Sequence, residues 1–492
     1  MSPKTYANSY RLALLALSAA AFVTAGCGTG SLMPTQSSSG PTGSSFVVGT
    51  DAPLASVVSF STTISVTATP VGDTPGGSSD VSLVSSQSVD FARYNGLQTL
   101  LNETSVTAGS YGAITITLGT TMSPGTIGYL DASGSGAPTI QTESVTYASS
   151  SNPVTITLAN PYVVPTSGAP AGIRIDLDLA KSIGVDSTGA ITGTVTPTFD
   201  VKTVGHGDSS AHIDELVGGV VTPPTCTAEP CTFTINGPHG EPFTINATST
   251  TEWDGSATPG SLNTTSVVLV AGQLDVSDQT LDADEVAILT DSKFMAAGLI
   301  TYVTPTSGQA TSMDFYVRSV LPSTLTDAPL GGLAQVNISG NEKYSVLWMH
   351  NNPFTQMLFN ASALTPGQEI AVGGTDAEAT PSSGSAITVN RIHLQDRGYN
   401  GTVVAGSQDQ GQGSFTMTIT GFAGTVVPTN VTVFAGSHCD FRFGFGAFSD
   451  LSDGASVRVV GVLLKNSTNG NLVLVARHID GWNFSDFSTF AF

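Results

Sequence analysis

The feature that most constrains the fold of this chain is an alternation of apolar and polar residues with a period of two. Val58, Phe60 and Ile64 fall on one side of this pattern, with Ser and Thr between them, and segments 154–158 and 173–179 repeat it. Alternate residues of a strand point to opposite faces, so such segments are typical of half-buried strands in antiparallel sheets. Helical periodicity is almost absent. We therefore predict an all-β protein.

The size and charge of the chain limit its architecture and its partners. Its 492 residues are too many for one compact core, so several domains are expected. Charged residues make up 11% of the sequence, and the net charge is −22. An acidic surface with few Lys and Arg argues against nucleic acid as a partner and against electrostatic docking on anionic lipid.

The N-terminal segment 1–26 is typical of an export signal. Lys4 and Arg11 make its start positive, and a short apolar run follows that is too short for a permanent membrane span. The run ends at Thr24-Ala25-Gly26, directly before Cys27. This arrangement resembles the lipobox of bacterial lipoproteins, in which the cysteine is acylated. The alternative is an ordinary secretory signal followed by an unrelated cysteine.

A lipid on Cys27 would make the membrane the first partner of this protein. Gly28, rather than Asp, follows the cysteine, which by analogy with Gram-negative sorting favours the outer membrane, on its periplasmic or surface face. Residues 27–45 are rich in Gly, Ser, Pro and Thr, a composition that predicts a flexible tether.

The first folded domain is expected over residues 46–204. Its strand patterns and Gly/Pro turns predict an N-terminal antiparallel β-sandwich. A polar link over residues 205–214 follows and contains His206 and His212. A transient metal contact is one interpretation of these histidines, and a solvated linker is the one we favour.

Several short motifs in this first domain occur in the order found in an uncharacterised family of bacterial lipoproteins. The resemblance is to the domain-of-unknown-function 4382 family, and it implies envelope location and a β fold without an established activity. The motifs are Thr50-Asp51-Ala52-Pro53, Ser88-Val89-Asp90-Phe91, Ala108-Gly109-Ser110-Tyr111, 175–182 and 195–199.

The second half of the chain contains an internal repeat. Gly218, Gly298 and Gly401 each precede an apolar strand, and a strand with aromatic and Thr residues follows each of them. The repeats resemble the domain-of-unknown-function 5666 family, which implies three small barrels of the oligonucleotide/oligosaccharide-binding (OB) type. The expected units are residues 215–292, 293–396 and 397–482, followed by an aromatic tail at 483–492.

The cysteines beyond Cys27 have separate expected roles. Cys226 and Cys231 are close in sequence, and in an oxidising compartment they predict a small disulfide-closed loop. A metal site at these cysteines would need two further ligands, and none has suitable spacing. Cys439 is expected to be buried in a strand region as a small apolar residue.

No catalytic, nucleotide-binding or metal-binding motif is present, so neither a catalytic residue nor a cofactor is predicted. Asp176 and Asp178 fall on the same face of one strand. Such a carboxylate pair is a weak candidate for calcium binding or acid–base chemistry, and a solvent-exposed strand face is the favoured interpretation. Asp282, Asp284 and Glu285 raise the same question, and a strand end is again favoured over a calcium loop.

Aromatic residues are the more informative candidates for ligand binding. Trp253 and Trp348 occupy similar places in the first two repeats, and Phe441, Phe443 and Phe445 alternate along one strand of the third. An exposed row of rings would form a platform for sugars or an apolar partner, whereas a buried row would be barrel core, which we favour.

These observations predict a non-enzymatic, multidomain lipoprotein of the cell envelope. It would bind or scaffold a polysaccharide or an envelope protein through its barrels. An envelope hydrolase on the same framework is the alternative, and it would require catalytic residues distant in sequence to converge. A surface or matrix protein with a mechanical role is a third possibility.

Overall fold

The computed structural model describes most of the chain between residues 41 and 481. Cys27 and the tail at 483–492 lie outside the described residues, as does the expected tether up to residue 40. No helix among the described residues is long and apolar enough to cross a membrane. The positions not described within this span are 53–55, 73–78, 95, 132–136, 149, 168–170, 187–189, 205–210, 237–241, 254–257, 276–279, 291–293, 322–327, 347–357, 375–385, 420–428, 443 and 467–468.

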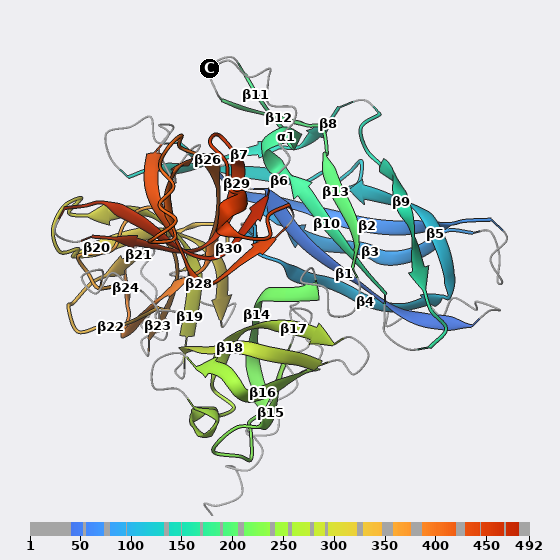
Figure 1. Ribbon diagram of the computed structural model, residues 1–492. Coiled ribbons are helices and arrows are strands. Elements are labelled where there is room, and N and C mark those ends of the chain that lie inside the picture. Colours follow the sequence, from blue (N-terminus) through green and yellow to red (C-terminus); the bar gives the residue numbers. More distant parts are fainter. Residues whose placement is uncertain are drawn as a thin grey trace, which may run out of the picture. The chain divides into compact units, whose positions relative to one another are not determined.

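The first domain is a sandwich of two main sheets (Figure 1). Sheet A has the order β13 (Phe199–Val204), β10 (Ala171–Asp178), β1 (Thr42–Ala52) and β4 (Thr99–Thr107). Sheet B has the order β7 (Thr139–Ser144), β6 (Thr126–Asp131), β2 (Val57–Pro70), β5 (Gly109–Leu118) and β9 (Val154–Val164), and β3 (Val81–Asp90) also pairs with β2. A small third sheet contains β11 (Ile183–Val185), β12 (Ile191–Val195) and β8 (Thr146–Tyr147).

Two features of the sandwich differ from the sequence expectation. β1 pairs with β10 in parallel, whereas the other strand pairs of the two main sheets are antiparallel. Residues 42–45, which we had assigned to the tether, form the first part of β1, and Ser45 is fully buried. A short helix, α1 (Leu179–Ser182), and a 3-10 turn, η1 (Phe91–Arg93), connect strands of this domain.

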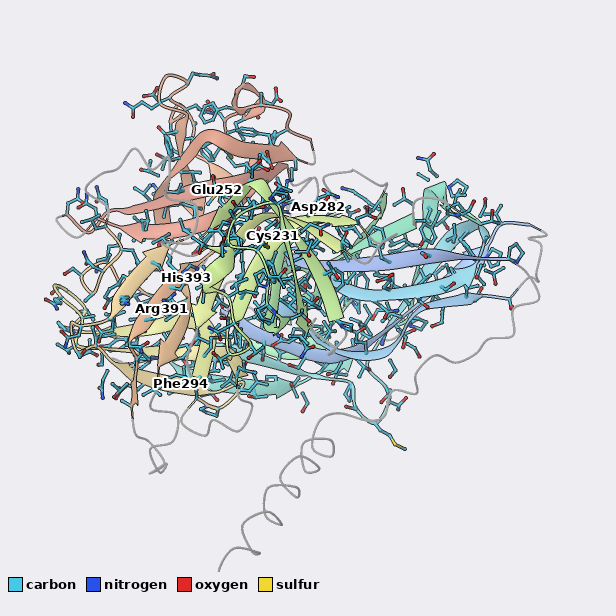
Figure 2. The ribbon with its side chains drawn as sticks, turned by 90° about the horizontal axis from the view of Figure 1, so that it is seen from below. Cys231, Glu252, Asp282, Phe294, Arg391 and His393 are labelled. Carbon is cyan, nitrogen blue, oxygen red and sulfur yellow. A yellow bond between two sulfur atoms is a disulfide. The ribbon has the colours of Figure 1, made fainter. Side chains whose placement is uncertain are left out.

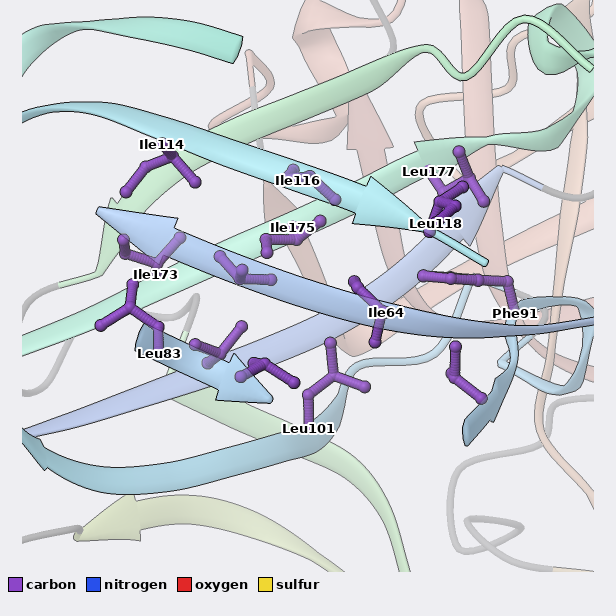
Figure 3. Close-up of a cluster of buried hydrophobic side chains, with 14 of the residues drawn as sticks. Ile64, Leu83, Phe91, Leu101, Ile114, Ile116, Leu118, Ile173, Ile175 and Leu177 are labelled. Carbon is purple, nitrogen blue, oxygen red and sulfur yellow. The ribbon is translucent and has the colours of Figure 1, made fainter. Parts of the chain in front are cut away.

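The core of the sandwich is formed by the apolar side of the predicted alternation. Ile64 and Val66 of sheet B and Ile173 and Ile175 of sheet A are fully buried in one cluster. Figure 3 shows the side chains of Ile64, Ile173 and Ile175 between the strands. In the second half of β2, Ile64, Val66 and Ala68 are buried, and Thr63, Ser65 and Thr67 between them are partly exposed, because alternate residues of a strand face opposite sides.

The first and third repeats are closed five-stranded barrels, called barrel 1 and barrel 3 here. In each barrel the third and fifth strands pair in parallel, as in the OB fold. Barrel 1 has the order β14 (His212–Thr222), β15 (Cys231–Asn236), β16 (Pro242–Trp253), β18 (Thr280–Thr290) and β17 (Val267–Asp275), and includes η3 (Pro259–Ser261). Barrel 3 has the order β26 (Arg397–Val403), β27 (Ser414–Ile419), β28 (Thr429–Arg442), β30 (Leu472–Gly481) and β29 (Ser456–Lys465), and includes η5 (Phe448–Asp450).

The second repeat, called the middle unit, is a seven-stranded sheet. Two short strands, β21 (Leu333–Asn337) and β22 (Lys343–Val346), take the place of β16. Similarly, β24 (Ile387–Thr388) and β25 (Arg391–Gln395) take the place of β18, with the same parallel pairing. Its core cluster includes Val462, Leu464 and Val473 of barrel 3. The order is β22 (Lys343–Val346), β25 (Arg391–Gln395), β23 (Glu369–Gly374), β19 (Phe294–Thr304), β20 (Ser312–Leu321), β21 (Leu333–Asn337) and β24 (Ile387–Thr388).

The repeated glycines have a common structural reason. A Cβ atom on Gly218, Gly298 or Gly401 would overlap with the carbonyl oxygen of the facing strand, which belongs to Asn236, Tyr316 or Thr418 respectively. Each glycine therefore permits close approach of the first two strands of its unit. The sequence repeat thus corresponds to a repeated contact in the fold.

The units are joined by apolar contacts. Phe46 and Val48, on the outer face of sheet A, pack in one cluster with Ile213 and Leu216 of barrel 1. A second cluster joins the outer faces of β17 and β18 to β19 of the middle unit. A third joins Val58 of the sandwich to the middle unit. Sheet A is therefore covered on both faces.

The strand contact at Gly218 can be tested by a pair of alanine substitutions in β14. Gly218→Ala should destabilise the protein by about 1–3 kcal/mol, because the added methyl group forces two strands apart. Gly219→Ala is the matched control, since a Cβ at Gly219 meets nothing within 4 Å. Urea denaturation measures both, and an equal loss of stability in the two variants would contradict the close approach.

Candidate functional site: a buried charge junction between the units

Most of the described arginines of this acidic chain lie inside the protein. A charged side chain in the interior is costly unless a partner of opposite charge compensates it. The arginines occupy sandwich, middle unit and barrel 3 strands near the places where the units meet. Those at most 6% exposed are Arg174, Arg318, Arg397, Arg442, Arg458 and Arg477.

Asp214, at the start of barrel 1, is the centre of the largest group of contacts. Its side chain is fully buried. One carboxylate oxygen accepts a hydrogen bond from the backbone N–H of Gln98 in the sandwich at 2.9 Å. The other oxygen lies 3.8 Å from Arg442 and 3.5 Å from His478, both in barrel 3. Asp214 thus connects three units, and we call this group the Asp214 hub.

Two imidazoles complete the hub, and each lies between two carboxylates. His212 contacts Asp214 through Nδ1 at 3.2 Å and Asp284 through Nε2 at 3.0 Å. His478 contacts Asp480 through Nδ1 at 3.0 Å. The period of two places His212 with Asp214 on one face of β14, and His478 with Asp480 on one face of β30.

The ionisation of the hub follows from these contacts. Burial would lower the pKa of His478, but the carboxylates of Asp480 and Asp214 outweigh it and raise this pKa above 6.5. Burial would likewise raise the pKa of Asp214, but His478, His212 and Arg442 hold it well below 3.8. These shifts favour the charged forms of His478 and Asp214, so the contact between them is an ion pair.

Asp176 and Asp178 are not on a solvent-exposed face, so that interpretation is wrong. Asp176 is 1% and Asp178 is 5% exposed. Asp176 accepts a hydrogen bond from Arg174 at 2.8 Å, and both terminal nitrogens of Arg458 in barrel 3 lie 3.4 Å from it. Asp178 caps α1 by accepting from the N–H of Lys181. The outer face of sheet A is covered, and Arg458 supplies the compensating charge.

A second group of ion pairs connects the middle unit to its neighbours. Arg477 of barrel 3 donates to Asp396 at 3.0 Å and lies 3.9 Å from Glu285 of barrel 1. Arg318 donates to Glu369 at 3.3 Å. A small cavity with room for about one water molecule lies beside this pair and is also lined by Arg93 and Glu215.

The remaining acidic candidates have different surroundings. Glu285 is buried, whereas Asp282 is exposed and accepts a hydrogen bond from Asn246 at 2.9 Å. Asp284 is 65% exposed and its partner is His212. The described residues contain no group of three or more His, Cys, Asp or Glu side chains that could hold a metal ion. His212 is 13% exposed and bonded, so the solvated-linker interpretation is wrong for it. His206 lies outside the described residues.

The cysteines and aromatic candidates lie mainly in and around the barrels. Cys231, the first residue of β15, forms a disulfide with Cys226, and Cys439 is a partly buried free thiol. Figure 2 shows Cys231 and Asp282 on barrel 1. Trp253 packs against Phe233 and the core of barrel 1. Phe441 and Phe445 pack against the core of barrel 3. Trp348 and Phe443 lie outside the described residues.

Comparisons with known proteins identify part of the sandwich. Residues 45–192 match the family described as domain of unknown function DUF4382. No curated protein matches the chain. A solved structure described as drosophila Unr CSD456 matches at 12% sequence identity over 55% of this chain and 98% of that chain, with a TM-score of 0.14. A TM-score this low supports no conclusion about fold or function.

The hub predicts a large effect for the neutralisation of Asp214. Asp214→Asn keeps the shape but removes the buried carboxylate shared by Arg442 and His478, which retain Asp440 and Asp480 as partners, and this loss should cost about 3–5 kcal/mol. Asp284→Asn, at a carboxylate 65% exposed, should cost less than about 1 kcal/mol. Denaturation midpoints of the two variants measure this difference, and equal midpoints would exclude a hub role for Asp214.

The hub also predicts a bell-shaped dependence of stability on pH. Because the folded pKa of His478 is raised above 6.5, its contribution is complete below that pH and is lost as pH rises through the raised value. Because the folded pKa of Asp214 is lowered below 3.8, its contribution is complete above that pH and is lost as pH falls through the lowered value. The thermal midpoint should be highest between pH 3.8 and 6.5. His478→Gln should flatten the alkaline side, and an unchanged profile would contradict this assignment.

Proposed function

We propose that this protein is a non-enzymatic lipoprotein of the cell envelope that holds its barrels as one rigid body and binds a polysaccharide or an envelope protein through them. Acylation at Cys27 and an outer-membrane location are part of this proposal. The Cys226–Cys231 disulfide supports an oxidising compartment outside the cytoplasm.

The observation that carries the proposal is a matched surface on the two closed barrels. In OB barrels, ligands bind on the face of the second and third strands. In barrel 1 the facing outward pairs there are Thr234 with Thr244 and Thr232 with Asn246. In barrel 3 they are Thr416 with Thr432 and Thr418 with Asn430.

These two surfaces, called the Thr/Asn faces, have the same chemistry. Hydroxyl and amide groups both donate and accept hydrogen bonds, and none of the outward pairs is charged. The exposed carboxylate of Asp282, which accepts from Asn246, lies beside the barrel 1 face and disfavours anionic ligands there. A neutral polysaccharide offers many hydroxyl groups with the same double capacity. The Thr/Asn faces therefore favour neutral polysaccharide over charged ligands.

The buried junction supports a non-enzymatic role. Arg, His and Asp are residue types common in active sites. In this protein, buried side chains of these types form ion pairs with one another between the units. Within the part of the chain that the structure describes, Ser345 contacts Nδ1 of His393 at 2.9 Å, and His393 is labelled in Figure 2. The imidazole of His393 is fully buried. The serine hydroxyl contacts its Nδ1, whereas in a Ser-His-Asp triad the hydroxyl contacts Nε2 and Nδ1 faces the carboxylate. This contact does not favour the hydrolase alternative.

The full chain with Cys27→Ala, displayed against an array of neutral and charged glycans, tests the proposal. Binding to neutral glycans is expected, and Thr232→Glu combined with Thr432→Glu should abolish it, because carboxylates replace hydroxyls on both Thr/Asn faces. Thr157→Glu, at an exposed strand position of the sandwich, is the matched control.

Three outcomes would count against this assignment. Loss of binding in the Thr157→Glu variant would move the site away from the barrels. Release of shortened glycan products would favour the hydrolase. The binding role would be rejected if no glycan on the array is bound and cross-linkers at the Thr/Asn faces capture no envelope protein.

A further inference from the structure

A small cavity lies where barrel 1, the sandwich and the middle unit meet. Its volume of about 10 Å³ is at the lower limit of what one water molecule needs. The charged residues that line it are Glu215 of barrel 1, Arg93 of the sandwich, and Arg318 and Glu369 of the middle unit. Three units therefore contribute charge to a space of molecular size.

A β-bulge directs Glu215 toward this cavity. Ile213 and Leu216 of β14 are both buried in the core cluster of barrel 1, and the two residues between them face the single residue Ala271 of β17. One extra residue in a strand places two consecutive side chains on the outer face. Asp214 therefore reaches the hub, while Glu215 lines the cavity.

A second β-bulge directs Arg318 toward the same cavity. In β20, Val317 pairs with Gly298 and Ser319 pairs with Ala297, so Arg318 is the extra residue. Val317 is buried in the core of the middle unit, whereas Arg318 and Ser319 both line the cavity. Bulges re-aim side chains in this way. Two oppositely charged groups thus reach the cavity through irregularities of their strands.

Arg318 has hydrogen-bond donors that the described residues do not use. Its Nη1 donates to Glu369 at 3.3 Å. Its Nε and Nη2 are buried, and neither has a hydrogen-bond partner among the described residues. A buried donor without an acceptor is costly. An acceptor in the cavity would remove this cost.

The carboxylate of Glu215 has the complementary requirement. Burial raises the pKa of Glu215, and the charges of Arg93 and Arg318 offset this effect only in part. The ionised carboxylate is therefore incompletely compensated by its surroundings. A hydrogen-bond donor in the cavity would stabilise it.

We propose that the cavity binds one water molecule, which accepts a hydrogen bond from Arg318 and donates one to Glu215. Water fits because it both accepts and donates, and because a cavity of this volume admits no polyatomic anion. A halide ion would satisfy Arg318 but would also face the carboxylates of Glu215 and Glu369. The water joins barrel 1 to the middle unit, beside the direct ion pair of Arg318 with Glu369.

Crystals of the full chain with Cys27→Ala, soaked in bromide, test the identity of the ligand. We expect one ordered peak of water density within hydrogen-bond distance of Arg318 and Glu215, without an anomalous signal from bromide. An anomalous peak in the cavity would identify an anion site and overturn the proposal. A cavity without ordered density would overturn it equally.

Magnetic relaxation dispersion of water oxygen, which counts long-lived buried water molecules in solution, tests the contacts. Glu215→Leu should lose one such water, because leucine offers no acceptor. Glu215→Gln should keep it, since the amide retains an acceptor oxygen at the same place. Glu143→Leu, on β7 and outside the cavity lining, is the matched control and should leave the count unchanged. An unchanged count in Glu215→Leu, or loss of the water in Glu215→Gln, contradicts the proposal.

Discussion

The arrangement of the four units depends on the compensation of one buried charge. Asp214 is inaccessible to water, so its carboxylate must be compensated by protein groups. Those groups come from the sandwich through Gln98 and from barrel 3 through Arg442 and His478. Separation of any one of these units would leave a buried charge without its partner, which is energetically costly. The units are therefore coupled, and the body behaves as one structure rather than a string of domains.

The buried arginines also explain how similar barrels take unique places. The apolar faces of repeated units resemble one another, and contacts between such faces alone distinguish poorly among alternative dockings. Ion pairs such as Arg458 with Asp176 and Arg477 with Asp396 form in one arrangement only. Buried ion pairs add little net stability compared with apolar packing, so their main effect here is to select the arrangement. Because few cations remain for the surface, the exterior of the protein is acidic.

The sequence predicted the strands and repeats more successfully than the tertiary contacts of their polar side chains. Alternation of apolar residues identified strands such as β2 and β10, and the glycines at 218, 298 and 401 identified the repeats, because both signals are local. The same alternation showed that Asp176 lies opposite the core, but it carried no information about Arg458, which covers it from 282 residues away. His212 and Asp214 are two positions apart in the sequence, as are His478 and Asp480, so each pair could be recognised as sharing one strand face. Their convergence depends on tertiary docking, which no local pattern encodes.

The long separation between partners has a consequence for the time course of folding. β1 hydrogen-bonds to β10 more than 100 residues later, and Asp176 meets Arg458 near the end of the chain. Contacts so distant in sequence make for slow folding, since a large loop must close before any contact is gained. Until barrel 3 has formed, a growing chain carries carboxylates such as Asp176 and Asp214 without the arginines that compensate them in the folded protein. Completion of the last barrel is thus the event that commits the whole chain to its native state, and a nascent chain would remain exposed to proteases and to aggregation until then.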